Sequence, residues 1–265
     1  MLRPRAERPL HLTIYLQQNQ PPGVPPLELT GERTLPDVPE ENYWYRRHLA
    51  VYRWIADRCT GLRVVDLACG EGYGSAVLAA HAAEVTGVDA NPEAHEHARL
   101  RYAAPGLRFE RGLVEEWDEG APWDAIVFLQ TIEHVTEPAA LLGRFAKLLV
   151  PGGVAYVSTP NRLTLAPPGA ERSGNPWHVR EYSPPEYAAL VASVFPRHEL
   201  LGLFHAGKLR AHELALRLGW DRVHPALRLT RPFYDRFLPA VSESDFELRA
   251  GSLERSLDLL AICPA

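Results

Sequence analysis

The chain has 265 residues, with 28 basic and 33 acidic side chains, so its formal net charge at pH 7 is −5. Hydrophobic residues make up 46% and charged residues 23% of the chain, a globular composition that excludes a wholly disordered protein. No stretch approaches the ~18 apolar residues of a membrane-spanning helix. The acidic balance argues against nucleic acid as the main partner, because phosphate binding relies on a cationic surface.

Cysteine usage indicates a reducing environment. The three cysteines, Cys59, Cys69 and Cys263, form no CxxC pair, and an odd number predicts no disulfide framework. The amino-terminal arginines are not followed by the apolar core of a secretory signal. We therefore expect a cytoplasmic protein without structural zinc held by thiolates.

The first 39 residues are rich in proline, and we interpret them as a loosely held arm with a short strand over residues 11–16. Residues 40–265 are predicted to form one domain. It opens with an amphipathic helix over residues 43–58, preceded by Glu40 and Glu41, whose charges suit a helix amino terminus.

From residue 62 onward, strand and helix patterns alternate. Strands are predicted over residues 63–67, 84–88, 107–111, 125–129 and 154–158. Helices are predicted over residues 74–81, 92–102 and 138–149. This alternation indicates an α/β fold in which a parallel sheet has helices on both faces.

The pattern changes after residue 158. A long loop, helix, strand and helix are predicted over residues 160–180, 184–194, 199–204 and 208–218, then an irregular aromatic segment over 220–250 and a final strand over 256–262. Loops as long as the one over residues 160–180 are usually functional in compact domains. The insertion at about residues 206–252 is interpreted as a lid over the substrate side.

A glycine-rich turn after the first strand is the strongest functional signal. Asp66 ends that strand and is followed by Gly70, Gly72 and Gly74, while Asp89 ends the second strand. Glycine lets the backbone approach a ligand closely, and open α/β sheets bind ligands at this edge. A carboxylate inside the turn would repel a pyrophosphate but can accept a cationic amino group, and Asp89 can accept hydrogen bonds from ribose hydroxyls.

These motifs resemble the class I S-adenosylmethionine-dependent methyltransferases, over about residues 60–160 and again at the final strand. The resemblance implies a Rossmann-like sheet of seven strands, an amino-terminal helix, a lid insertion before the last strand, and S-adenosylmethionine as cofactor. The residues that it places around the cofactor are Asp66, Ala68, Gly70, Gly72, Asp89, Ala90, Leu113, Val114 and Gln130.

Two of these positions depart from the family pattern. Ala68 stands where the family usually has glycine, and Leu113 stands where it often has an aspartate that accepts from the adenine amino group. Leu113 cannot accept that bond, so the backbone around Val114 would have to recognise the adenine. A nicotinamide dinucleotide is the competing ligand; Asp89 suits it too, but Asp66 in the loop fits a methyl donor better.

A polar cluster follows the fourth strand. If the chain is helical there, Gln130, Glu133 and His134 share one face directed into the cleft. With His178 in the long loop, they resemble metal-dependent members of the family, the ubiquinone-biosynthesis O-methyltransferases and small-RNA terminal 2′-O-methyltransferases, with a Glu-x-x-Glu-His pattern and a distal histidine. By that resemblance Glu133, His134 and His178 hold Mg²⁺ or Mn²⁺, although Gln130 removes one anionic ligand.

The cluster admits two chemistries. A divalent cation would stabilise the alkoxide of a sugar hydroxyl and position it for attack on the methyl group. Without a metal, His134 or His178 would act as general base, because imidazole titrates near neutrality. These residues could also serve only to hold the loop by hydrogen bonds.

The segment over residues 29–48 resembles actinobacterial methyltransferases associated with polymethylated polysaccharides, in particular the methylglucose lipopolysaccharides of mycobacteria. By that resemblance Tyr43, Arg46 and Arg47 cover the cofactor, with an arginine near its carboxylate. The alternative is an amphipathic helix with a solvated basic face.

Together these patterns predict an S-adenosylmethionine-dependent O-methyltransferase acting on a carbohydrate hydroxyl, assisted by a divalent metal. A small phenolic or amine metabolite is the alternative acceptor, in an apolar pocket around Phe233, Tyr234 and Phe237. A non-catalytic cofactor-binding partner protein is a third interpretation, which Leu113 and Gln130 support. No oligomeric state is predicted.

Overall fold

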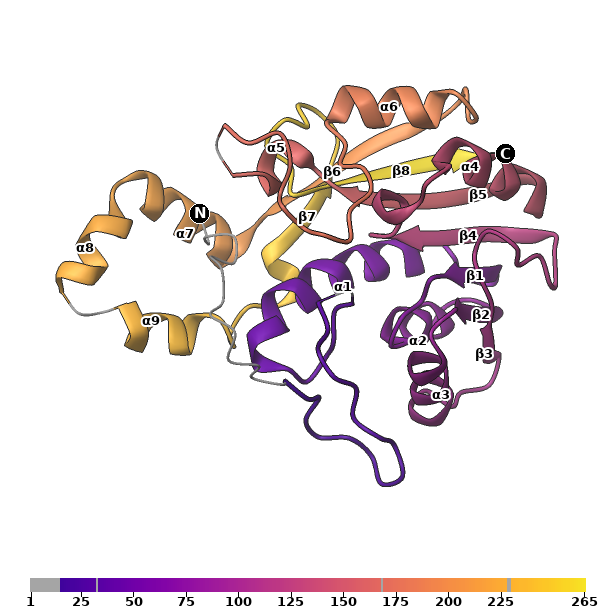
Figure 1. Ribbon diagram of the computed structural model, residues 1–265, viewed down its shortest axis with the longest axis horizontal. Helices are drawn as coiled ribbons and strands as arrows, with labels where there is room; N and C mark the ends of the chain where they lie inside the picture. The colour runs from indigo at the N-terminus through magenta and orange to yellow at the C-terminus, as the bar shows by residue number, and fades with distance from the viewer. Residues whose placement is uncertain (1–14, 32, 168, 228–229) are drawn as a thin grey trace.

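The computed structural model describes residues 15–31, 33–167, 169–227 and 230–265 (Figure 1). Most of the strand expected over residues 11–16 lies outside the described residues. Its described end forms an isolated antiparallel bridge between Leu16 and Glu28. Within the described ranges, no helix has the length and apolar character needed to cross a membrane.

One mixed sheet forms the centre of the protein, with strand order β3-β2-β1-β4-β5-β8-β6-β7. The strands are β1 (Arg63–Leu67), β2 (Glu84–Asp89), β3 (Leu107–Arg111), β4 (Trp123–Leu129), β5 (Leu149–Pro160), β6 (Glu199–His205), β7 (Phe246–Arg249) and β8 (Asp258–Pro264). Strands β1 to β5 pair in parallel, whereas β8 runs antiparallel to both of its neighbours. The five predicted parallel strands are therefore confirmed.

The sheet has eight strands, so the expectation of seven was wrong. The additional strand is β7, which pairs antiparallel with β6 at the edge of the sheet. It contains only four residues, of which Phe246 is buried and Glu247 exposed. An alternation of buried and exposed residues over only four positions is a weak signal in a sequence. The segment is a strand because it pairs with β6.

Helices cover both faces of the sheet (Figure 1). They are α1 (Asn42–Ala56), α2 (Tyr73–Ala79), α3 (Pro92–Arg101), α4 (Pro138–Leu148), α5 (Arg162–Leu165), α6 (Pro184–Ala192), α7 (Gly207–Arg217), α8 (Trp220–Ala226) and α9 (Thr230–Phe237). Successive strand residues point to opposite faces: Val64 belongs to the core cluster beneath α1 and α2, and Val65 to the one beneath α4 and α6. The parallel core is thus buried on both sides.

The segment expected to be irregular over residues 220–250 is mostly regular. It contains α8, α9, the short 3₁₀ helix η3 (Glu243–Asp245) and β7. Phe233 and Phe237 of α9 are one helical turn apart and stack with ring centroids 5.1 Å apart. Aromatic residues that looked irregular in sequence are therefore at helical spacing.

The described part of the amino-terminal arm is not loosely held. Leu27, Leu35 and Val38 form a small buried cluster, and the side chain of Gln17 donates to the backbone oxygen of Pro36 and accepts from the backbone nitrogen of Leu27. Apolar residues scattered among the prolines thus give this segment a core of its own, which proline content alone does not reveal.

Helix α1 is fixed to the sheet by a buried ion pair. Arg47 Nε lies 2.7 Å from Asp258 Oδ2, and the same guanidinium donates to the backbone oxygen of Leu257 at 2.7 Å. Both side chains are almost fully buried. The pair therefore connects α1 to the start of β8, at the carboxyl edge of the parallel strands.

We predict that Arg47→Met strongly destabilises the protein, because it leaves the Asp258 carboxylate buried without its counter-charge. Breaking one side of a buried pair typically costs about 3–5 kcal/mol in the free energy of unfolding. Chemical denaturation monitored by circular dichroism measures this change. Arg46→Met, which removes a partly exposed ion pair with Glu243, is the matched control and should cost less than about 1 kcal/mol. Equal losses for the two variants would contradict the assignment.

Candidate functional site

The glycine-rich turn between β1 and α2 adopts an unusual backbone. Ala68, Gly70 and Gly72 have φ values of +57°, +58° and +96°. A side chain at Gly72 would place its Cβ 2.7 Å from Ala98 Cβ, so only glycine fits against α3. Ala68 accepts a left-handed conformation that glycine, the usual family residue, adopts without strain.

Asp89 connects this turn to the end of β2. Its Oδ2 accepts from the backbone nitrogen of Gly70 at 2.8 Å, and its Oδ1 accepts from that of Asn91 at 2.9 Å. Each carboxylate oxygen has a second lone pair, and Asp89 is half-buried beside exposed Ala90. This placement leaves acceptor capacity for the two hydroxyls of a ribose.

An apolar surface lies next to Asp89. The backbone nitrogen of Gly112 donates to the backbone oxygen of Asp89 at 3.2 Å, which brings the following residues to the same edge. Leu113 is 53% exposed, while Val114 is half-buried against the core. An exposed leucine here offers a contact for the face of a purine, and hydrogen bonding to its edge is left to the backbone.

Asp66 does not face open space. Its side chain is fully buried; Oδ1 accepts from the Tyr52 hydroxyl at 3.1 Å and Oδ2 from the Ser75 hydroxyl at 2.6 Å. Burial raises the pKa of Asp66 to about 7. The Asp66 carboxylate bonds to Tyr52 of α1 and Ser75 of α2 and so positions both helices around the turn, while direct contact of Asp66 with a cationic amino group stays a prediction.

Glu71, within the same turn, is a residue that the sequence interpretation missed. It is 1% exposed and accepts from Gln17 Nε2 at 2.9 Å and from the Tyr102 hydroxyl at 2.7 Å. His97 Nε2 and an Arg101 nitrogen lie 3.0 and 3.2 Å from its Oε1. The amino-terminal arm and α3 are therefore both fastened to the glycine-rich turn.

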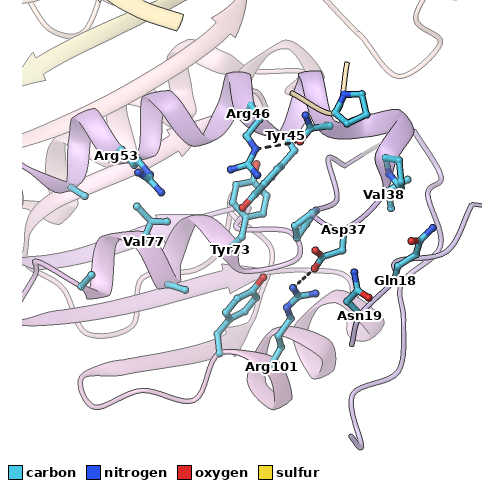
Figure 2. Close-up of a pocket in the computed structure, with 18 of the residues that line it drawn as sticks. Gln18, Asn19, Asp37, Val38, Tyr45, Arg46, Arg53, Tyr73, Val77 and Arg101 are labelled. Atoms are coloured by element: carbon cyan, nitrogen blue, oxygen red, sulfur yellow. Dashed lines mark hydrogen bonds and ion pairs between the residues drawn. The ribbon is translucent and has the colours of Figure 1, made fainter. Parts of the chain in front are cut away.

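A groove of about 1130 Å³ lies between the arm, α1 and α2 (Figure 2). Tyr45 of α1 and Tyr73 of α2 meet there edge to face, with ring centroids 5.1 Å apart. Arg101 pairs with Asp37 at 2.6 Å across its lower side. The other two arginines of its wall, Arg46 and Arg53, both pair with Glu243. The groove thus separates the arm from α1. The charges of the three arginines in its wall are neutralised by acidic side chains.

Neither Tyr43 nor Arg47 covers the turn as expected. The guanidinium of Arg47 is committed to Asp258, so it does not extend toward a cofactor carboxylate. The Tyr43 hydroxyl lies 2.8 Å from His205 Nε2, and burial raises its pKa to about 12. Both residues hold α1 against β6 and β8, because these strands supply buried polar partners that local sequence does not reveal.

His48 of α1 reaches the turn instead. Its Nδ1 lies 3.5 Å from the Tyr73 hydroxyl, and burial lowers its pKa to about 4. The ring is therefore neutral at pH 7. No motif marked this residue in the sequence; its place on the helix, one position after Arg47, was the only signal.

The second polar cluster begins at the end of β4. Gln130 has φ +52°, and its side-chain nitrogen donates to the Ser158 hydroxyl at 3.0 Å. The chain then forms only a short 3₁₀ helix, η2 (Ile132–His134). Gln130 therefore does not share a helical face with Glu133 and His134, because the left-handed residue reverses the chain before the helix starts.

Glu133, His134 and His178 come together as expected. Each offers one ligand atom, and these atoms all lie within 4.8 Å of one another. The backbone nitrogens of Val179 and Arg180 donate to the Glu133 backbone oxygen at 2.9 and 3.0 Å. These two bonds return the long loop to β4 and place His178 beside His134.

The hydrogen bonds of the two imidazoles define their orientation. His134 Nδ1 lies 2.7 Å from the Trp177 backbone oxygen, and His178 Nδ1 lies 2.8 Å from Glu181 Oε1. These oxygens only accept, so each Nδ1 carries a proton and each Nε2 is the acceptor atom of its ring. Histidines that bind metals typically have this arrangement. Nε2 of His178 accepts from the Asn175 side-chain nitrogen at 3.0 Å, so a cation bound there would replace that amide.

The environment of Glu133 suits a cation. Its Oε2 accepts from the Thr159 hydroxyl at 3.0 Å, and burial raises its pKa to about 8. A neighbouring positive charge would offset the burial cost of the carboxylate. One carboxylate and two imidazole nitrogens form a mixed donor set that fits a divalent cation such as Mn²⁺; Mg²⁺ prefers more oxygen.

A family profile described as "Methyltransferase domain" matches residues 39–213. A relative from Mycolicibacterium smegmatis, named a probable S-adenosylmethionine-dependent methyltransferase, is 38% identical over 246 residues, which span 89% of this chain and 94% of the relative. A ubiquinone biosynthesis O-methyltransferase from Xylella fastidiosa is 40% identical over 111 residues, 40% of this chain and 45% of the relative.

A crystal structure of an S-adenosylmethionine-dependent methyltransferase from Mesorhizobium loti has the same fold, with a TM-score of 0.56 and 20% identity over 83% of this chain and 98% of that one. The chain therefore belongs to the methyltransferase domain family. It is an S-adenosylmethionine-dependent methyltransferase, and S-adenosylmethionine is its cofactor.

We predict that Asp89→Ala weakens S-adenosylmethionine binding, because it removes acceptors for the ribose hydroxyls. Hydrogen bonds to a charged group contribute about 1.5–3 kcal/mol, so the dissociation constant should rise roughly tenfold to a hundredfold in isothermal titration calorimetry. Glu93→Ala, which removes an exposed carboxylate nearby on α3, should leave affinity unchanged. Unaltered affinity of the Asp89 variant would exclude this ribose site.

Proposed function

We propose that this methyltransferase acts on a hydroxyl oxygen of a carbohydrate and that Glu133, His134 and His178 hold a divalent cation beside the acceptor. The convergence of these three ligand atoms within 4.8 Å is the observation that carries the proposal. The cluster follows β4, the strand next to β1 and its glycine turn. Cofactor and acceptor would therefore meet at one edge of the sheet.

The transfer itself is an in-line displacement. The acceptor oxygen forms the new bond to carbon, the bond from sulfur to the methyl carbon breaks, and the electron pair remains on sulfur as a neutral thioether. A sulfonium is already a good leaving group, so the protein chiefly aligns the reactants. A bound divalent cation would lower the pKa of the acceptor hydroxyl.

The chain's own residues determine where the hydroxyl proton goes. With Nδ1 bonded to a backbone oxygen, His134 presents Nε2 as a base. Glu181 holds His178 in the same way; burial opposes the ionisation of Glu181, but hydrogen bonds from Ser173 and His178 outweigh it and lower the pKa. An imidazole nitrogen that binds a cation cannot also accept a proton. Removing the metal therefore distinguishes a histidine that acts as a metal ligand from one that acts as a general base.

Exposed side chains next to the cluster support a carbohydrate. Trp177 and Val179 are 51% and 52% exposed and flank His178 in the chain. An indole packs its apolar face against the C–H face of a sugar ring while the hydroxyls remain free for polar partners. Tyr182 is fully buried instead, so it packs the loop and offers no surface to an acceptor.

The alternative of a phenolic or amine acceptor has no specific support in the described residues. Phe233, Tyr234 and Phe237 pack on one another and on His212, so they do not line an open pocket as that interpretation required. The O-methyltransferase name of the Xylella fastidiosa relative supports oxygen as the acceptor atom. A cytoplasmic location and the closing of the insertion as a lid stay predictions.

We predict that turnover depends on a divalent cation. With a panel of glucose oligosaccharides and labelled S-adenosylmethionine, EDTA should lower methyl transfer more than tenfold, and Mn²⁺ or Mg²⁺ should restore it. Sugar methylation that is unaffected by EDTA would remove the metal from the proposal. Methylation of catechols but of no sugar would remove the carbohydrate.

We further predict that His134→Ala and Glu133→Gln lower kcat about a hundredfold or more, since positioned acid–base or metal chemistry contributes at least that much. Cofactor affinity, measured by calorimetry, should stay within twofold of the unsubstituted protein. His198→Ala is the control, because His198 caps a turn at Phe195, remote in sequence from the cluster. Unchanged kcat in His134→Ala would exclude this histidine from the mechanism.

A further inference from the structure

The helices α7, α8 and α9 form an insertion that extends outward from the sheet (Figure 1). The insertion begins directly after β6 and returns to the body at η3 and β7. Its base is fastened to α1, where Asn42 donates to the backbone oxygens of Leu238 and Val241 at 2.9 and 3.0 Å. The helices themselves reach beyond the rest of the molecule.

Aromatic residues form the inner side of this insertion. His212 of α7 is buried and packs against two rings of α9: its centroid is 5.9 Å from that of Phe233 and 4.8 Å from that of Phe237. Trp220 of α8 contacts Phe233 at 5.5 Å. The three helices therefore pack through their aromatic residues, which leaves the opposite side chains outward.

Exposed aliphatic residues lie on α7 and α8 and at their carboxyl ends. Leu214 and Leu218 are 57% and 80% exposed, and Val223 and Leu227 are 46% and 59% exposed. Each pair is separated by four residues, so its members lie on the same helical face. Exposed apolar residues that gather on neighbouring helix faces mark a surface for a membrane or a partner.

The insertion is also basic. Residues 207–237 contain seven basic and three acidic side chains, a net charge of +4. The whole chain carries −5, so the remainder carries −9. Arg210, Arg217 and Arg222 are exposed on the same helices as the leucines. The positive charge of the protein is therefore concentrated where its aliphatic surface is exposed.

We propose that the α7–α9 insertion binds the surface of an anionic lipid bilayer. Amphipathic helices with arginine beside exposed leucine lie in the interface, with the apolar side chains at the acyl boundary and the cations at the headgroup phosphates. A second copy of this chain would bring another +4 to the same surface, which disfavours self-association. The opposite charges of insertion and body would make the insertion the part of the protein that contacts the membrane.

This placement has a consequence for the active edge. Strand β6 ends at the same edge as β5, since β8 runs antiparallel to both, and His205 at its end contacts Tyr43 of α1. A bound insertion would hold the cofactor edge close to the lipid surface. The binding does not require any particular acceptor.

Vesicle flotation of the full chain tests the proposal. We expect the protein to float with vesicles of equal parts phosphatidylglycerol and phosphatidylcholine, to remain unbound with phosphatidylcholine alone, and to dissociate as NaCl is raised. Leu214→Gln with Leu218→Gln should weaken binding at least tenfold. Arg210→Gln and Arg222→Gln should each weaken it roughly fivefold.

The control is Leu100→Gln, at a leucine of α3 that is 39% exposed on the body, and it should bind vesicles normally. Calorimetric S-adenosylmethionine binding checks that every variant is folded, and it stays intact whether or not the insertion binds lipid. Failure of the unsubstituted protein to bind anionic vesicles would overturn the proposal. So would a dimer in analytical ultracentrifugation that the paired leucine substitutions dissociate.

Discussion

A buried carboxylate is costly unless partners surround it, and the carboxyl edge of this sheet carries four, each 0–1% exposed: Asp66, Glu71, Glu133 and Asp258. The hydroxyls of Tyr52 and Ser75 donate to Asp66, and the guanidinium of Arg47 donates to Asp258. Glu71 draws its partners from the arm and α3. The hydrogen-bond and ion-pair partners of these carboxylates come from α1, α2, α3 and the arm. The arrangement of these segments at one edge of the sheet therefore follows from the need to pair the buried acids.

Glu133 differs from Asp258 and Glu71 in what the chain supplies. Asp258 has a guanidinium and Glu71 has an arginine and a histidine, whereas the bond given to the Glu133 side chain comes from the Thr159 hydroxyl. Its raised pKa follows from burial without a protein cation. The two imidazoles beside it provide further donor atoms, so Glu133 suits an external positive charge, whereas Asp258 and Glu71 have basic side chains of the protein beside them.

Local patterns predicted the elements that depend on local physics. Apolar runs located β1 to β5, and glycine with the terminal Asp89 located the cofactor turn. The arm, β7 and Arg47 were misjudged, because their structure depends on distant partners: Asp258 is 211 residues from Arg47. The meeting of His134 and His178 was predicted only through a family resemblance, since no periodicity relates two residues so far apart.

The ion pair between α1 and β8 also bears on biosynthesis. Arg47 leaves the ribosome 211 residues before Asp258, which at ~5–20 residues per second is a delay of roughly 10 to 40 seconds. Throughout that time Arg47 lacks its acid, so α1 can pack on α2 and bond to Asp66 through Tyr52, but its connection to β8 is incomplete. The last connection of α1 to the sheet therefore forms only when translation is almost finished.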